Sequence, residues 1–91
     1  MRFEWNALKA AANLRKHGIS FGEAASVFFD PLSATGHDPD HSLDEARFVT
    51  FGMSSSGRLL VVAHAERDDA IRIITARQAT RAERKLYEEE D

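Results

Sequence analysis

The sequence contains no cysteine, which excludes disulfide bonds, zinc sites built on thiolates and a cysteine nucleophile. It also has no apolar run near the ~18 residues that a membrane-spanning helix requires. Its opening, MRFEWNALK, lacks the apolar segment of a secretory signal. A chain of 91 residues is too short for two independent cores. We therefore expect a single domain over residues 1–91, cytoplasmic and without a membrane attachment.

Charge of one sign does not dominate, since the formal net charge is −3, but the charges are unevenly placed. Residues 58–87 hold seven basic and four acidic side chains, and residues 88–91 are all acidic. A basic stretch followed by an acidic tail is compatible with RNA or an acidic protein as a partner. Solvated faces of a sheet and a helix would explain the same distribution.

Capping residues indicate two short helices near the amino terminus. Asn6 can cap the first, and Gly18 is suited to end it. Ser20 and Glu23 have the spacing of a capping box for the second, which the Asp30-Pro31 pair should end. The residues expected to face the core are Ala7, Ala11 and Leu14 in the first helix and Phe21, Ala24, Ala25 and Phe28 in the second.

The rest of the chain predicts four strands and a last helix. The strands are expected over residues 33–37, 47–53, 59–65 and 70–76, joined in hairpin succession. Thr80 and Glu83 form a further capping box for a helix to about residue 89. The fold class is therefore α+β in the order ααββββα, with two N-terminal helices, a four-stranded, mainly antiparallel sheet and a C-terminal helix.

Metal and cofactor sites are not expected. The segment His37-Asp38-Pro39-Asp40-His41 has two imidazoles and two carboxylates, but no later residues at ligand spacing complete a site. The glycines lie at turns and strand ends, so the sequence contains no phosphate-binding glycine loop. We expect residues 37–41 to be a solvated loop.

A cluster of basic and titratable residues in the second half is the strongest chemical signal. Strand alternation places His64 with Leu60 and Val62, and Arg72 with Ile74. Arg77, Arg81 and Arg84 fall at i, i+4 and i+7, which predicts a continuous basic stripe running into the last helix. The cluster comprises His64, Glu66, Arg67, Arg72, Arg77, Arg81, Arg84 and Tyr87.

RNA phosphates or the acidic residues of a protein would neutralise this cluster. Two structural alternatives stay open. Arg72 could pair with Glu66 or Asp69 across the hairpin, and His64 could be a hydrogen-bonded core residue.

A series of motifs runs in order along nearly the whole chain. The opening motif is Phe3-Glu4-Trp5, then Lys9, Asn13, Lys16-His17-Gly18 and Phe21, and it continues with Ala24-Ala25, Val27-Phe28, Asp30-Pro31 and the DPDH run at 38–41. The later matches are Glu45, Arg47-Phe48, Gly52, Ser54, Gly57-Arg58-Leu59, Val61-Val62, His64, Glu66-Arg67, Arg72-Ile73-Ile74, Ala76-Arg77, Ala79, Arg81, Glu83 and Tyr87. In these motifs and their order the sequence resembles the BrnT toxins. Departures are confined to Asn6, Thr75 and Asp68-Asp69.

This resemblance implies a ribonuclease toxin of a type II toxin–antitoxin pair with a RelE-like fold. It also implies a BrnA-like antitoxin that carries a ribbon-helix-helix module, in a 2:2 heterotetramer where the antitoxin dimer bridges two toxins. Operator DNA would be contacted only through the antitoxin. We expect the antitoxin to cover the face that carries Arg72 to Arg84.

Three functions are compatible with these residues. The first is metal-independent RNA cleavage, with His64 as general acid or base, Arg72 and Arg77 on the phosphate, and Tyr87 on the leaving group or a base. Arg67, Arg81 and Arg84 would then bind the RNA strand. The second is a non-catalytic partner or corepressor of a DNA-binding antitoxin. The third, direct DNA binding, lacks a recognition helix and is disfavoured by the net negative charge.

Overall fold

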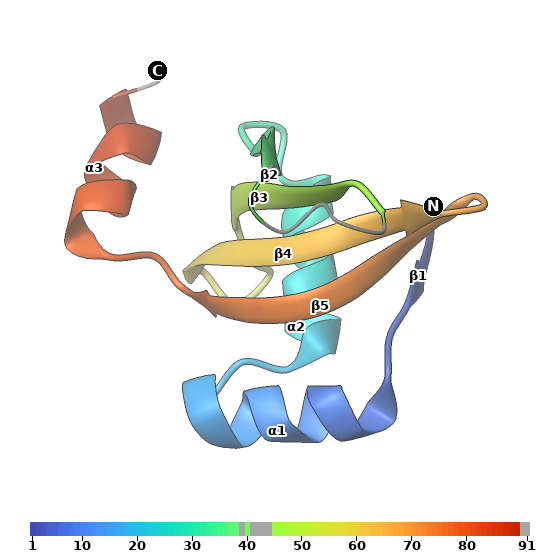
Figure 1. The fold of residues 1–91 in the computed structure, drawn as a ribbon. Helices are drawn as coiled ribbons and strands as arrows, with labels where there is room; N and C mark the ends of the chain where they lie inside the picture. The colour runs from blue at the N-terminus through green and yellow to red at the C-terminus, as the bar shows by residue number, and fades with distance from the viewer. Residues whose placement is uncertain (39, 41–44, 90–91) are drawn as a thin grey trace.

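The computed structural model describes residues 1–38, 40 and 45–89 (Figure 1). The elements in chain order are β1 (Arg2–Glu4), α1 (Ala7–His17), α2 (Phe21–Ser26), the 3-10 turn η1 (Val27–Phe29), β2 (Ala34–Asp38), β3 (Arg47–Met53), β4 (Leu59–Arg67), β5 (Ala70–Gln78) and α3 (Arg81–Glu89). None of the described helices is long and apolar enough to cross a membrane.

The α+β class is confirmed, but the described sheet has five strands rather than four. Their order is β1-β5-β4-β3-β2, and β1 pairs parallel with β5 while the other pairs are antiparallel. The prediction missed β1 because it is only three residues long and pairs with a strand far along the chain. Strands β4 and β5 each end two residues later than predicted, and the extension of β4 reduces the turn between them to Asp68 and Asp69.

The helix ends follow the predicted caps. The Asn6 side chain accepts a hydrogen bond from the backbone N–H of Lys9 at 3.0 Å, and Gly18 adopts the left-handed conformation with φ +70°. Ser20 accepts from the N–H of Glu23 at 3.0 Å. The second helix is shorter than predicted, because α2 ends at Ser26 and continues only as the 3-10 turn η1.

The Glu23 carboxylate joins α2 to the turn between β3 and β4. It accepts hydrogen bonds from the hydroxyls of Ser54 and Ser56 and forms an ion pair with Arg58. The Arg58 hydrogen bond is the main cause of the fall in the Glu23 pKa to about 2, against a raising effect of burial. Glu23 thus helps to start α2 through its backbone N–H, and its carboxylate anchors the helix to the β3–β4 turn.

Helix α1 packs on the sheet through a different face from the predicted one. Ala7, Ala11 and Leu14 are exposed, whereas Ala10 packs against the core and Asn13 is buried. The Asn13 amide donates to the carbonyls of Ala76 (2.9 Å) and Ile19 (3.0 Å), and its oxygen accepts from the Ala76 N–H at 3.1 Å. Asn13 therefore pairs with the backbone N–H and carbonyl of Ala76 at the outer edge of β5, as a neighbouring strand would.

Asn13→Ala is expected to lower the free energy of unfolding by about 2–4 kcal/mol. The change leaves one buried N–H and two carbonyls without their partner, and each such group costs about 1–3 kcal/mol before relaxation. Urea unfolding at neutral pH measures the loss. Asn6→Ala is the control, because an exposed cap costs only about 1 kcal/mol. Equal effects of the two changes would contradict the role of Asn13.

The core lies on one face of the sheet. Its buried residues are Ile19, Phe21, Ala24 and Val27 from the helical segment and Leu60, Val62, Ile73 and Ala76 from the strands. Figure 1 shows α1 below the sheet, α2 behind it and α3 beyond one end of β5. None of the described helices lies in front of β4 and β5, and we call this side of the sheet the open face. The β4 residues Leu59, Val61 and Ala65 alternate onto this face and are nevertheless at most 7% exposed.

Candidate functional site

A β-bulge places two of the predicted arginines on the open face of the sheet. Ala63 pairs with Thr75 but His64 pairs with Ile73, so Ile74 is an extra residue in β5. Without it, Arg72 and Arg77 would point to opposite faces, because they are an odd number of residues apart. With it, Arg72 pairs with Ala65, Arg77 pairs with Val61, and both side chains lie opposite the core. The prediction that Arg72 shares a face with Ile74 assumed unbroken alternation, which the bulge interrupts at Ile74.

Arg72 belongs to a group of arginines around two carboxylates. Arg47 and Arg72 both pair with Ala65, one from each side, so they share the open face. Arg67 donates two hydrogen bonds to Glu45, at 2.9 and 3.1 Å, and Arg72 lies 3.9 Å from Glu4.

These charges act on Glu45. The Arg67 hydrogen bond is the largest cause that lowers the pKa of Glu45, and the positive charges of Arg67, Arg47 and Arg72 lower it further against a raising effect of desolvation. Arg47 was missed as a site residue in the sequence. The signal was available, because alternation in its strand places it on the face opposite Phe48.

Arg77 lies at the other end of this face and is held by α3. Its guanidinium donates two hydrogen bonds to Glu83, at 2.8 and 2.9 Å. This pairing is the main cause that raises the pKa of Arg77 and lowers the pKa of Glu83 to about 2, against burial in both cases. The Glu83 carboxylate thus occupies the two guanidinium nitrogens of Arg77 that could otherwise bind a phosphate.

Tyr87 ties the far end of α3 to the body of the protein. Its hydroxyl donates to Asp30 at 2.5 Å, and Asp30 also accepts from the N–H groups of Met53 (2.7 Å) and Leu32 (2.9 Å). Burial alone would raise the pKa of Asp30, but the three hydrogen bonds outweigh it and the pKa is lowered. Tyr87 thus lies within α3, and Arg77 of β5 is hydrogen-bonded to Glu83 of the same helix.

The predicted stripe of Arg77, Arg81 and Arg84 does not form. Arg77 belongs to β5 and the helix begins only at Arg81, so helical spacing does not connect the three. Arg81 and Arg84 are exposed on α3. The capping box that starts this helix is present, because Thr80 and Glu83 exchange hydrogen bonds of 2.8 and 3.2 Å.

His64 lies on the helix-covered face of the sheet, apart from Arg72 and Arg77. Its side chain is 2% exposed and packs against the ring of Phe28 at a centroid distance of 4.8 Å. Nε2 is hydrogen-bonded to the Thr50 hydroxyl at 2.7 Å, and Nδ1 has no partner among the described residues. Burial lowers the pKa of His64 to about 4, so the ring is neutral at pH 7. The structure does not bring this histidine together with the arginines.

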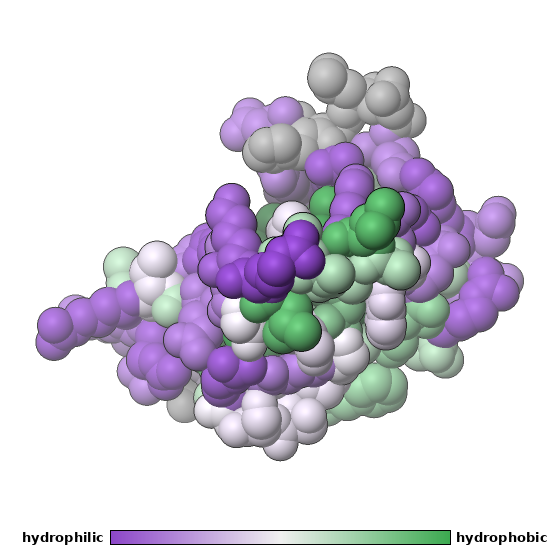
Figure 2. Space-filling view, turned by 90° about the horizontal axis from the view of Figure 1, so that it is seen from below, coloured by the Kyte–Doolittle hydropathy of each residue, from purple (hydrophilic) through white to green (hydrophobic). Residues whose placement is uncertain are grey.

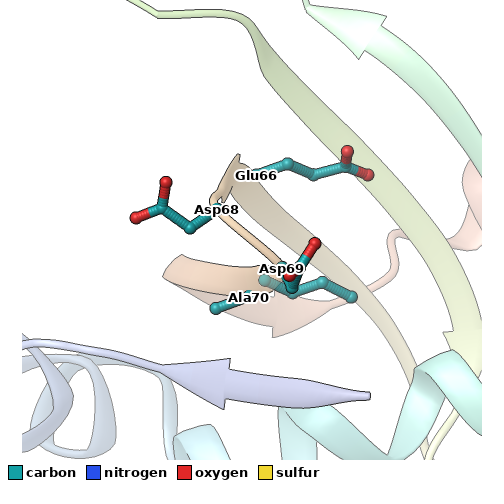
Figure 3. Close-up of a pocket in the computed structure, with 5 residues that line it drawn as sticks. Glu66, Asp68, Asp69 and Ala70 are labelled. Atoms are coloured by element: carbon teal, nitrogen blue, oxygen red, sulfur yellow. The ribbon is translucent and has the colours of Figure 1, made fainter.

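The acidic residues near the β4–β5 turn do not gather around Arg72. Figure 3 shows the Glu66, Asp68 and Asp69 side chains, which line a cavity and point in different directions. Arg72 pairs with Glu4 instead, which answers the open alternative of a hairpin ion pair. In the part of the chain that the structure describes, no three His, Asp or Glu residues are grouped as metal ligands. Of the segment 37–41, Pro39 and His41 lie outside the described residues.

Fold and site together define a small α+β protein in which the sheet face without a described helix carries arginines at both ends. The family model described as "Ribonuclease toxin, BrnT, of type II toxin-antitoxin system" matches residues 5–83. The chain therefore belongs to the BrnT family, and membership of a type II system implies a protein antitoxin as a partner.

The fold has a solved counterpart. The chain is similar to the crystal structure of the Brucella abortus ribonuclease toxin BrnT, with a TM-score of 0.65 and 20% identity. The similarity covers 89% of this chain and 99% of that one. At this identity the comparison supports the fold alone. A search among curated proteins finds no match.

Proposed function

We propose that this chain is a metal-independent endoribonuclease whose substrate lies on the open face of the sheet. The observation that carries the proposal is the bulge in β5, which aligns Arg72 and Arg77 on that face with Arg47 beside them. A bulge that re-aims one side chain is typical of strands next to active sites. Arginine forks bind phosphate through paired hydrogen bonds and remain charged at all relevant pH values.

The proposed reaction is a transesterification within the RNA. The 2′-oxygen attacks the adjacent phosphorus, the bond from phosphorus to the 5′-oxygen breaks, and the 2′-hydroxyl proton passes to solvent. The products are a 2′,3′-cyclic phosphate and a 5′-hydroxyl. Arg72 and Arg77 stabilise the additional negative charge of the phosphorane, which is where fixed cations contribute most.

Tyr87 is the proposed proton donor to the 5′-oxygen. It lies one helical turn from Glu83, and Glu83 holds Arg77. Substrate phosphate would replace the Glu83 carboxylate on Arg77, and Arg67, Arg81 and Arg84 would bind the flanking strand. His64 is left out of this scheme, because a buried neutral ring on the other face cannot reach the phosphate.

The partner proposed for the toxin is a BrnA-like antitoxin with a ribbon-helix-helix module, in a 2:2 heterotetramer. In this arrangement operator DNA is bound by the antitoxin. The alternative function, a non-catalytic corepressor, uses the same partner and no RNA.

Purified protein without its antitoxin is expected to cleave RNA in the presence of excess EDTA. The reaction above needs no divalent ion, since arginines supply the positive charge. Gel electrophoresis of an end-labelled RNA, followed by mass analysis of the fragments, should show 2′,3′-cyclic phosphate and 5′-hydroxyl ends. Binding to the antitoxin without any cleavage would favour the corepressor. Cleavage that EDTA abolishes would contradict metal independence.

A further inference from the structure

The outer face of α1 is an apolar surface that the described chain does not cover. Leu8 is 81% exposed and Leu14 is 52% exposed, and Ala7 and Ala11 lie exposed beside them. Ala7, Ala11 and Leu14 share one side of the helix at a spacing that usually faces a core, and Leu8 lies next to it, about 60° round the helix from Ala11. Figure 2 views the molecule from the α1 side and shows apolar green surface in the middle of this face beside projecting hydrophilic side chains.

Charge on this helix is of one sign. Lys9, Arg15 and Lys16 are exposed on α1, and residues 5–18 contain no acidic side chain, although the whole chain has a net charge of −3. Lys9 and Lys16 also line a cavity of about 240 Å³ between α1 and the edge of β5, with Ile74 and Thr75 on its other wall. The apolar face is therefore bordered by a basic groove.

We propose that α1 is a docking surface for an acidic amphipathic helix of the antitoxin. The partner's apolar residues would pack on Leu8 and Leu14, and its carboxylates would reach Lys9 and Lys16. Small side chains such as Ala7 and Ala11 allow two helices to approach closely, and the leucines provide the apolar contact. The identity of the partner rests on the proposed function, whereas its chemistry rests on this surface.

Two other occupants fit the surface less well. A second copy of this chain would bring like charges together, since a two-fold contact sets the same basic residues opposite one another. A membrane-binding helix usually presents several bulky apolar side chains. The exposed apolar side chains of α1 are two leucines and several alanines, which favours a protein partner.

This surface also differs from the face at which the sequence predicted the antitoxin. The arginines there already have acidic neighbours within the chain, namely Glu83 for Arg77 and Glu45 for Arg67. No described acidic residue forms an ion pair with Lys9, Arg15 or Lys16. A partner therefore gains more from neutralising α1 than from covering charges that are already paired.

The test uses the purified full chain and the purified antitoxin from the same operon, with the dissociation constant measured by calorimetry or biolayer interferometry. The double variant Leu8→Glu with Leu14→Glu is expected to weaken binding by about 100-fold, as for central apolar contacts. Lys9→Glu with Lys16→Glu is expected to weaken it by at least about 10-fold and to reduce its dependence on salt. Both variants should keep the thermal stability and the RNA cleavage of the wild type.

Two controls make the result specific. Leu32→Glu changes a leucine that is 60% exposed elsewhere and should leave affinity unchanged. Arg81→Glu with Arg84→Glu tests the competing face. The proposal would be overturned if both α1 variants bound the antitoxin with wild-type affinity. It would also be overturned if the free chain formed a dimer and these variants made it monomeric. If the wild type did not cleave RNA but bound the antitoxin through α1, only the proposed activity would be overturned.

Discussion

Arg72→Ala and Arg77→Ala are each expected to lower RNA cleavage by about 10²–10³-fold, the usual effect of removing one group that stabilises charge in a transition state. Both side chains lie on the open face, and neither belongs to the core. Single-turnover cleavage of a labelled RNA measures the effect, and circular dichroism checks the fold. Arg77→Lys should recover only part of the activity, because it keeps the charge and loses the fork.

The Arg77 result needs one matched control, because Arg77 also holds α3. Glu83→Gln removes the same ion pair from the other side and leaves the arginine in place. If Arg77 acts on the phosphate, Glu83→Gln keeps most of the activity while Arg77→Ala does not. Equal losses in the two variants would mean that Arg77 acts by positioning the helix. Arg15→Ala, on the other side of the molecule, should have no effect.

Stability is expected to fall by about 3 kcal/mol as the pH drops from about 6.5 to about 4, and His64 is the cause. The unfolded histidine has a pKa of about 6.5, whereas burial lowers the pKa of His64 in the folded protein to about 4. Between these values the unfolded state binds more protons, so stability rises with pH across this window. The contribution is fully present above the unfolded pKa and is lost below the folded one.

His64→Gln provides the comparison. It cannot titrate, and its amide can still bond to Thr50, so its stability should stay nearly flat from pH 6.5 to about 4.5. Below that, both proteins lose the contributions of Glu23 and Glu83, whose folded pKa of about 2 lies under the unfolded value of about 4.3. Urea unfolding across this pH range measures the difference. If the free energy of unfolding of His64→Gln fell with pH as steeply as that of the wild type, His64 would not be the cause.

The same variant examines the predicted catalytic role of His64. If the ring is a core residue, folded His64→Gln should cleave RNA within a few-fold of the wild type. A fall in RNA cleavage of about 10²-fold or more would instead support His64 as a general acid or base, since a positioned acid or base contributes about that much.

Local features of this protein could be predicted from the sequence because their causes are local. Asn6, Ser20 and Thr80 each accept the backbone hydrogen bond that begins a helix, and the positive φ of Gly18 ends α1. The strand β3 has the predicted bounds, since its alternation and the following turn define it. Family membership also followed from residues in order along the chain.

Only the tertiary structure decided which side of each element is buried and which site residues meet. The stripe of Ala7, Ala11 and Leu14 has the spacing of a core face, but the hydrogen bonds of Asn13 to β5 turn the helix the other way. The bulge at Ile74 moves Arg72 to the face of Arg77, while His64 stays in the core. Periodicity counts residues along one element, whereas burial and the faces of neighbouring strands depend on partners that are distant in sequence.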